Sequence, residues 1–373
     1  MRADTMGIVF SNISDSLIPS VASLRCMGSV PFAGKYRLID FVLSNLQSCG
    51  VTKVGIITKR NYHSLMDHLG SGKPWDLARK RGGIFVFPPF ATSGSGVYSG
   101  RVDALSGVSG LLRQSREEYV ILSDSSFVVN CDLEAMMERH IETGADITIA
   151  YTNGATPNAS HGGGAMTFSK LAADGRIQEI KMLPPGEQAK FSVNIAVIRR
   201  ELLLSLLKDA VSRNLISVAR DLLQKSTDSL RLYAYELPDP VYCVDSMRSY
   251  FETQMKLLDP EVRRQLFDGH HRINTAVTDT APARYGEQAK VVNSLVSDGC
   301  IINGEISGCI LGRNVIIERG AQLKNCVIMA NTKVAKNVQL SYVMTDKNVT
   351  VSEGITLTGS QSYPIYLEKD ALV

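Results

Sequence analysis

Three stretches of the sequence place serine and aspartate residues directly after an apolar run: residues 11–17 (SNISDSL), 123–127 (SDSSF) and 241–246 (VYCVDS). At the carboxyl ends of parallel strands, such residues meet in one ligand-binding crevice. The first stretch contains no glycine, although a loop that cradles phosphate groups with its backbone N–H groups needs glycines close to them. The positions therefore indicate a ligand site, and the residue types argue against phosphate chemistry there.

The elements that position these stretches can be recognised in the first 150 residues. Continuous apolar runs at 7–10, 51–59 and 118–126 predict buried strands. They alternate with amphipathic segments at 40–50, 61–72 and 104–114, which predict helices. This alternation is typical of a parallel α/β sheet. Residues 82–100, rich in glycine, serine and proline, predict a loop over the site.

The pattern changes from about residue 291, where small or branched residues recur every six positions. Cys309, Val315, Ala321 and Val327 keep this spacing, and the dipeptide Asn-Val recurs at 314, 337 and 348. A six-residue period is the signature of a parallel β-helix, in which each hexad forms one flat face of a triangular coil. Four or five coils fit, enough to share a continuous core. The predicted domains are residues 1–258, a linker at 259–290, and the β-helix at 291–373.

Composition excludes several classes of protein. A net charge of +3 and 7% aromatic residues give little support for nucleic-acid binding. The seven cysteines form no CxxC pair, which argues against a disulfide framework or a zinc site. No run of 18 apolar residues and no signal peptide is present. We therefore expect a cytoplasmic protein with no membrane span.

Specific motifs sharpen this interpretation. PFAGKYRLIDFVLSN (31–45), VYSGRVDAL (97–105) and NSLVSDGCIINGEISGCILGRNVII (293–317) resemble segments of the ADP-glucose pyrophosphorylase (glucose-1-phosphate adenylyltransferase) family. The resemblance runs from about residue 7 to about 355. It implies a Rossmann-like, GT-A-like nucleotidyltransferase domain followed by a left-handed parallel β-helix of hexapeptide repeats.

The resemblance breaks at the residues that the family uses on the nucleotide. Counting back from Lys35, the family's glycine-rich A-G-G-x-G-T/S-R-L loop falls on residues 11–18, with Leu17 at the arginine position. Asp15 places a negative charge where triphosphate would lie, and Met27 replaces the lysine of A-K-P-A. At about 3 kcal/mol for each lost contact of the oxyanion-hole type, the Leu17 and Met27 replacements together would cost on the order of 10⁴-fold in rate.

The metal ligands are replaced as well. Aligning the L-x-G-D-H-I-Y segment with residues 122–129 puts Ser126 at the catalytic aspartate, and PVYCVDS puts Cys243 at the second one. Met182 and Leu183 replace the glutamate–lysine pair. We therefore expect a regulatory subunit with little or no activity alone, with Mg²⁺ held only by its catalytic partner. The alternative is an active transferase with a rebuilt metal site, because Asp124 and Asp245 lie two residues from the lost ligands, on the same strand face.

The resemblance also implies partners and remnant sites. It implies a hetero-tetramer with a catalytic homologue, although homo-oligomers fit equally well. A small anionic effector would bind near Arg25, Lys35 and Arg37, unless Arg37 simply pairs with Asp40 or another carboxylate. The sugar-phosphate site would keep a remnant in which Arg101 replaces the usual threonine and either attracts phosphate or blocks the pocket; its members are Tyr98, Gly100, Arg101, Asp103 and Ser192.

Overall fold

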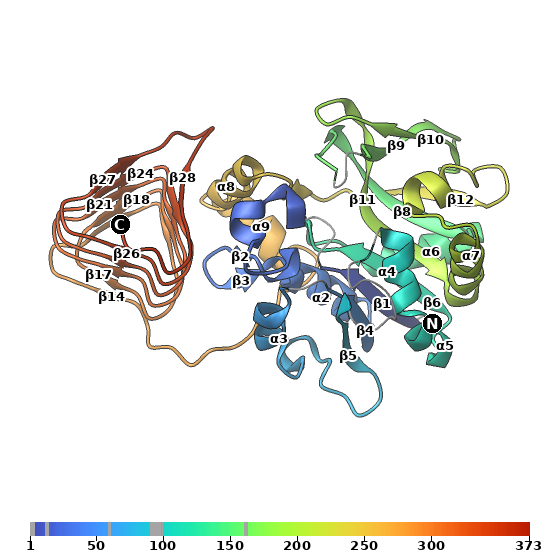
Figure 1. The fold of residues 1–373 in the computed structure, drawn as a ribbon, viewed down its shortest axis with the longest axis horizontal. Helices are drawn as coiled ribbons and strands as arrows, with labels where there is room; N and C mark the ends of the chain where they lie inside the picture. Colours follow the sequence, from blue (N-terminus) through green and yellow to red (C-terminus); the bar gives the residue numbers. More distant parts are fainter. Residues whose placement is uncertain (1–3, 12–14, 59–60, 90–97, 99, 160–162) are drawn as a thin grey trace.

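The chain folds into two domains (Figure 1). The computed structural model describes residues 4–11, 15–58, 61–89, 98, 100–159 and 163–373. The first domain is a mixed sheet with helices on both faces, and the second is a prism of stacked short strands. The predicted nucleotidyltransferase-like α/β domain and left-handed parallel β-helix are thus confirmed.

The parallel half of the central sheet runs in the order β6-β1-β4-β5. All six residues of β1 are buried, as expected for a strand that is covered on both faces. Residues 11 and 125, which follow β1 and β6, therefore lie at the same edge of the sheet. The bounds are β1 (Thr5–Phe10), β4 (Lys53–Ile57), β5 (Gly83–Phe87) and β6 (Tyr119–Asp124).

An antiparallel half extends the sheet beyond β6. Strand β11 pairs antiparallel with β6, β8 and β9, and β10 forms a hairpin with β9. The long strand β11 carries residues from the core of the sheet to the rim of the site. The strands are β8 (Ile147–Ala155), β9 (Ala165–Leu171), β10 (Ile177–Leu183), β11 (Gln188–Arg199) and β12 (Leu232–Glu236).

Two hydrophobic layers hold the helices against the sheet. One core joins α2, α3 and α6 to the first face, and another joins α4, α5 and α7 to the second. At the start of α2, the Asp40 carboxylate accepts from the backbone N–H of Arg37 and so satisfies one donor at the helix N-terminus. The bounds are α2 (Leu38–Ser48), α3 (His63–Leu69), α4 (Arg101–Gly107), α5 (Ser109–Gln114), α6 (Leu133–Thr143) and α7 (Arg200–Ser212). No helix in the described part of the chain is long and apolar enough to cross a membrane.

The predicted loop at 82–100 differs from the structure in its first part. Residues 83–87 form β5, the edge strand of the parallel half, which pairs with β4. The apolar run IFVF within a glycine-rich context explains the strand, since Gly82 and Gly83 adopt positive φ and turn the chain into it. Residues 90–97 and 99 lie outside the described residues.

The β-helix consists of three parallel five-stranded sheets, which meet at regular corners. Its interior is filled by the small and branched residues of the hexads, including Cys309, Val315 and Ala321. Asparagines at positive φ turn several corners, and their side chains stack in a ladder: Asn314 donates to Asn331, and Asn331 donates to Asn348, each at 3.1 Å. The strands run from β14 (Arg284–Tyr285) to β28 (Ile365–Leu367).

The region between the domains is structured. Helix α8 (Met247–Lys256) and helix α9 (Pro260–Asp268) lie between the sheet and the prism (Figure 1). They form a shared core with residues of both domains, including Phe41, Phe251 and Met344. The first coil begins at β14, before the predicted start at residue 291, and α9 occupies part of the predicted linker. This core fixes the β-helix against the α/β domain.

Candidate functional site

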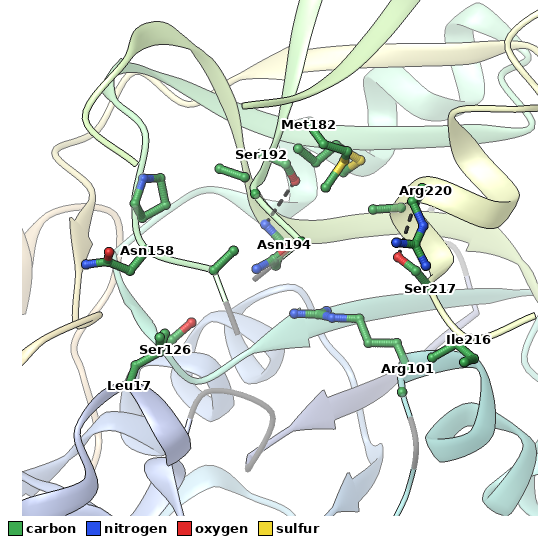
Figure 2. A pocket seen from close by; sticks show the side chains of 18 of the residues that line it. Leu17, Arg101, Ser126, Asn158, Met182, Ser192, Asn194, Ile216, Ser217 and Arg220 are labelled. Carbon is green, nitrogen blue, oxygen red and sulfur yellow. Dashed lines mark hydrogen bonds between the residues drawn. The ribbon is translucent and has the colours of Figure 1, made fainter. Parts of the chain in front are cut away.

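A cleft lies at the edge of the sheet where β1 and β6 end, and it has a volume of about 230 Å³ (Figure 2). Several of the residues singled out from the sequence line it: Leu17, Tyr98, Gly100, Arg101, Ser126, Met182, Ser192 and Cys243. The structure therefore brings together the ends of β1 and β6 with the β13 segment (Tyr242–Cys243), as the crevice rule predicts.

Arg101, which lines this cleft, forms an ion pair with the buried Asp124. The Arg101 guanidinium donates to Oδ2 of Asp124, whose side chain is 1% exposed. The other oxygen of Asp124 accepts from the backbone N–H of Ser126 at 3.0 Å. Both carboxylate oxygens are therefore engaged by the protein itself. Arg101 also lies over the ring of Phe10, 4.9 Å from its centroid, which holds the cation in place.

The second aspartate is engaged too. Oδ2 of Asp245 accepts from the backbone N–H of Asn158 at 2.7 Å and from its side-chain amide at 3.2 Å. Oδ1 of Asp245 accepts from the Ser246 hydroxyl at 3.3 Å. Burial, together with the negative charges of Asp245 and Asp124, raises the pKa of the Cys243 thiol well above its usual value. Cys243 therefore stays a thiol and is a poor metal ligand.

These side chains do not fit a divalent cation. The oxygens of Asp124 and Asp245 accept hydrogen bonds from the protein, and the positive charge of Arg101 beside Asp124 repels a second cation. In the described part of the chain, no group of three or more His, Cys, Asp or Glu side chains is placed to hold a metal ion.

Residues 11–18 align with the family's phosphate loop, and two of them, Asp15 and Leu17, show how this segment differs from such a loop. The Asp15 carboxylate accepts from the backbone N–H of Met27 at 2.7 Å. Met27 is fully buried in the apolar core between the domains, beside Val30 and Phe32, and does not line the cleft. Leu17 does reach the cleft and presents an apolar side chain. Residues 12–14 lie outside the described residues.

The residues predicted for the sugar-phosphate site lie only partly together. Gly100 lies so close to Ile216 that an added Cβ would be 2.4 Å from its Cγ2 atom. Ser192 accepts from the backbone N–H of Asn194 at 3.0 Å. Asp103 is absent from the described lining, but its negative charge, after burial, helps to raise the pKa of Tyr98. Leu183 pairs with Ala165 in the β9–β10 hairpin and also stays outside the lining.

Four polar residues of the cleft escaped the sequence analysis. Asn158 follows β8, and Asn194 lies within β11 at a positive φ, where the strand register is irregular. Ser217 and Arg220 come from a π-helical turn at Val218–Leu223 and the residue before it. Ser217 caps this turn by accepting from the backbone N–H of Arg220. None lies in a stretch that follows a predicted buried strand, so the sequence carried no signal for them.

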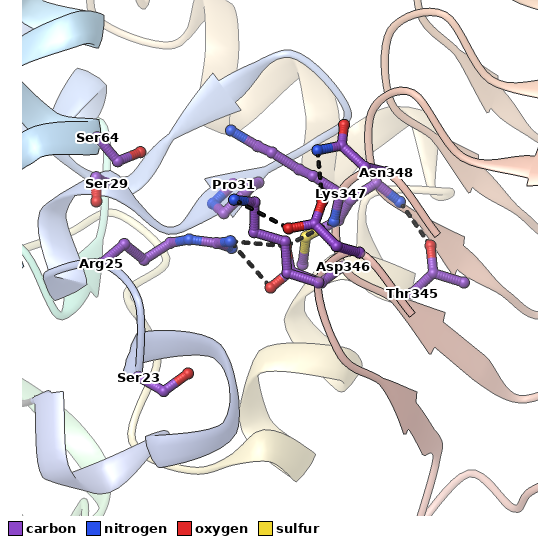
Figure 3. A network of polar contacts seen from close by, with 12 residues as sticks. Ser23, Arg25, Ser29, Pro31, Ser64, Thr345, Asp346, Lys347 and Asn348 are labelled. Carbon is purple, nitrogen blue, oxygen red and sulfur yellow. Dashed lines mark hydrogen bonds and ion pairs between the residues drawn. The ribbon is translucent and has the colours of Figure 1, made fainter. Parts of the chain in front are cut away.

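A second polar region joins the two domains (Figure 3). The guanidinium of Arg25 donates from Nη2 to both carboxylate oxygens of Asp346, at 2.8 and 2.9 Å. Both side chains are 3% exposed. Tyr366 donates its hydroxyl to Asp346 at 2.7 Å. The structure thus places Arg25 in a buried ion pair with the β-helix rather than on the surface of an anion site.

A pocket beside this ion pair contains an excess of positive charge. Its charged lining consists of four cations and one carboxylate: Lys35, Arg37, Arg313, Lys347 and Asp67. Arg37 donates to the backbone and hydroxyl oxygens of Ser64, so the alternative pairing of its guanidinium with Asp40 is not seen. Burial lowers the pKa of Arg37 to about 10. Burial, reinforced by repulsion from Arg37 and Arg25, lowers the pKa of Lys347 to about 8.

Comparisons with known proteins agree with this architecture. A nucleotidyl transferase family model matches residues 25–232, and a GlmU-like C-terminal hexapeptide model matches residues 278–362. The glycogen biosynthesis protein GlgD of Bacillus subtilis is 30% identical over 364 residues, which cover 98% of this chain and 95% of that protein. The chain belongs to the glucose-1-phosphate adenylyltransferase family.

Two further relatives carry different names, one GlgD and the other glucose-1-phosphate adenylyltransferase. GlgD of Geobacillus stearothermophilus is 33% identical over 86% of this chain and 83% of its own length. The glucose-1-phosphate adenylyltransferase of Bacillus mycoides is 31% identical over 87% of each chain. The GlgD proteins and the adenylyltransferase match this chain at similar identity. The role of the chain therefore has to be argued from its own cleft.

Proposed function

We propose that this chain is a regulatory, catalytically degenerate subunit of glucose-1-phosphate adenylyltransferase. That enzyme forms ADP-glucose and pyrophosphate from ATP and glucose 1-phosphate for glycogen synthesis. In this proposal the chain assembles with a catalytic homologue, as a hetero-tetramer, and changes the activity of that homologue. The Arg101–Asp124 ion pair is the main support for the proposal, because Arg101 binds the carboxylate that a rebuilt metal site would need.

The rest of the cleft supports the same conclusion. Nucleotidyl transfer requires positive groups aimed at the α-phosphate and the leaving pyrophosphate. Leu17 occupies one such position, and Met27 turns away into the core. The Asp15 carboxylate takes a backbone N–H group of the kind that phosphates use. These changes remove the charge complementarity that the reaction requires.

The alternative is an active transferase that uses Asp124 and Asp245. It would need both carboxylates to release their present partners, the Arg101 guanidinium and the amides of Asn158. Breaking a charged hydrogen bond of this kind costs about 1.5–3 kcal/mol, and metal binding would have to supply that free energy twice. We therefore favour the non-catalytic role.

Co-expression tests the proposed function. The chain and a catalytic homologue from the same source are expressed together, purified through a tag on this chain alone, and sized by light scattering. We expect the homologue to co-purify in a hetero-tetramer whose ADP-glucose synthesis differs in kcat or KM from that of the homologue alone. A chain that forms only homo-oligomers, and leaves the kinetics of the homologue unchanged, would refute the regulatory role.

The pocket between the domains supports a second, narrower part of the proposal. We propose that Lys35 and Arg37, together with Arg313 and Lys347, bind a small anion that acts as an effector. Among the described residues, none of these four cations has a carboxylate within ion-pair distance, and Lys35 lies over the ring of Tyr36. Arg25 pairs with Asp346 and does not line this pocket.

A further inference from the structure

Lys347 lies at the pocket between the two domains, directly after Asp346 of the buried ion pair (Figure 3). We propose that Lys347 is a site of reversible covalent modification by carbon dioxide, which adds to the neutral ε-amino group and forms a carbamate. The inference goes beyond the proposed function, because it concerns a reaction of this side chain and needs neither a partner subunit nor an effector.

The ε-amino group of Lys347 has no partner within the protein. Its backbone N–H donates to Oδ1 of Asp346 at 2.7 Å, but among the described residues its Nζ atom has no acceptor within hydrogen-bond or ion-pair distance. The side chain is partly buried where it lines the pocket. A lysine ammonium has three N–H donors and is strongly hydrated in water, so this environment gives little support to the charged form.

The charges around Lys347 are mostly positive. The other charged side chains that line the pocket are three cations and one carboxylate: Lys35, Arg37, Arg313 and Asp67. Arg25 adds a further positive charge close enough to repel Lys347, and Asp346 is already bound by Arg25. His68 lines the pocket as well, but it pairs with the buried Asp40. A neutral or negative group at position 347 is therefore favoured over a positive one.

This environment makes Lys347 a better nucleophile than an ordinary lysine. Burial, reinforced by repulsion from Arg37 and Arg25, lowers the pKa of Lys347 to about 8. At pH 8 about half of this amine is neutral, against about one part in 250 of an ordinary lysine with a pKa of 10.4. The neutral amine is the form that attacks an electrophilic carbon, and a neighbouring cation is one way in which proteins activate a lysine.

The reaction needs carbon dioxide and no other reactant. The nitrogen lone pair of Lys347 attacks the carbon of CO₂, an N–C bond forms, and one C–O π pair moves onto oxygen. The nitrogen then loses one proton to water, which leaves a carbamate anion and H⁺, and the reverse reaction restores the amine. The pocket has a volume of about 240 Å³, and CO₂ is a small neutral molecule whose approach the surrounding cations do not oppose.

The product fits the pocket better than the ammonium does. A carbamate carries one negative charge on two oxygens, which accept from guanidinium and ammonium donors. Lys35, Arg37 and Arg313 have no carboxylate within ion-pair distance among the described residues. In the same part of the chain, the Nη1 atom of Arg25 is buried and lacks an acceptor. Modification of Lys347 therefore replaces repulsion between the two domains with attraction.

Chemical trapping of the carbamate tests this inference on the full-length chain. The protein is equilibrated with ¹³C-labelled bicarbonate at pH 8, treated with a triethyloxonium salt that converts a carbamate into a stable ethyl ester, and mapped by peptide mass spectrometry. We expect the labelled ester on Lys347 at an occupancy at least tenfold above that on Lys333, an exposed lysine of the same β-helix. No ester on Lys347, or equal occupancy of the two lysines, would overturn the inference.

Variants provide a second readout. In ¹³C nuclear magnetic resonance spectra of the same sample, a carbamate signal of the wild type should be absent from Lys347→Gln and Lys347→Arg and present in Lys333→Gln. Lys347→Arg keeps the positive charge but has no amine to carboxylate, so the loss of signal there does not come from a change of charge. A signal that persists undiminished in Lys347→Arg would belong to another amine and would contradict the assignment. The peptide map of the wild type decides the matter even if the variants do not fold.

This inference and the proposed function can fail separately. Trapping uses the chain alone, with neither a catalytic homologue nor an effector present. A chain that regulates its homologue but carries no ester on Lys347 would refute this inference and leave the proposed function standing. A chain that carries the ester but leaves its homologue unchanged would support this inference and refute the proposed function.

Discussion

The cleft and the region between the domains both contain a buried ion pair, but they differ in the charge that remains around it. In the cleft, Arg101 neutralises Asp124, and the lining keeps one further cation. Between the domains, Asp346 neutralises Arg25, and the adjacent pocket keeps four cations against one carboxylate. The cleft therefore has little uncompensated charge, whereas the pocket between the domains has an excess of positive charge.

Under the proposed function, this difference corresponds to a nucleotide site that loses its chemistry while its fold survives. Of the two apolar replacements, Leu17 lines the cleft, and Met27 packs into the core between the domains. The pocket between the domains lies beside the Arg25–Asp346 ion pair, which joins the β-helix to the α/β domain. The pocket therefore combines a structural role with an unsatisfied positive charge.

The largest effect that we expect concerns the structural half of this comparison. Asp346→Ala leaves Arg25 buried without a counter-ion and removes the acceptor of the Tyr366 hydroxyl. The free energy of unfolding should fall by about 3–5 kcal/mol, as for other broken buried ion pairs. Urea denaturation followed by circular dichroism measures it.

Two controls sharpen this prediction. Asp209→Ala breaks the exposed Arg213–Asp209 pair on α7 and should cost less than about 1 kcal/mol. The double variant Arg25→Met and Asp346→Leu removes both charges and should recover most of the lost stability. An Asp346→Ala protein as stable as the exposed-pair control would show that the junction does not depend on this ion pair.

Restoring family residues to the cleft should have the next largest effect. Leu17→Arg combined with Ser126→Asp should raise ADP-glucose synthesis by at most about 10²-fold over the wild-type chain, the value of one oxyanion-type contact, because Arg101 and the glycine-free loop remain. Adding Met27→Lys should lower the thermal stability, since Met27 is fully buried. Turnover equal to that of a catalytic homologue would refute the view that several changes disable the cleft together.

The pocket between the domains gives a third prediction. Lys347→Gln removes one of its four cations and should weaken the binding of sulfate about tenfold, which corresponds to about 1.4 kcal/mol. Calorimetry measures the affinity. Lys333→Gln changes an exposed lysine of the same β-helix and should leave sulfate binding unchanged. Equal affinities of the two variants would remove the pocket as the anion site.

A smaller effect should appear with pH. The pKa of Lys347 is about 8 without an anion, so above pH 8 a bound sulfate has to draw a proton onto this lysine. Sulfate affinity should fall a few-fold between pH 7 and pH 9, and the fall should be absent in Lys347→Gln. In the unfolded chain, the pKa of Lys347 has the ordinary lysine value of about 10.4. Lys347 therefore binds more protons in the unfolded chain than in the anion-free folded chain. Between about pH 8 and 10, this group therefore makes the anion-free protein more stable as the pH rises.

Much of the fold was predictable because its signals are local. The apolar runs of β1, β4 and β6 and the six-residue period of the β-helix identify both architectures, and the structure confirms them. The strand β5 was missed because its apolar run lies among glycines and prolines that are typical of loops. The early start of the β-helix at β14 was missed because every residue of β14 and β15 is exposed, so the first coil lacks the periodic buried positions of the later coils.

The contacts within the two polar regions were not predictable, because they join residues that are distant in sequence. Arg101 was suspected of attracting phosphate or blocking the pocket, but its partner Asp124 depends on how α4 packs against β6. Arg25 and Asp346 are 321 positions apart, and no local pattern connects them. The replaced positions could be found from the motifs, whereas the new partners required the structure.

The most direct measurement is ADP-glucose synthesis by the purified chain alone, supplied with ATP, glucose 1-phosphate and Mg²⁺. If the cleft has lost its chemistry, product should form no faster than in an assay without protein. Turnover within the ordinary enzyme range, about 1–10³ s⁻¹, would contradict that loss and favour a rebuilt metal site.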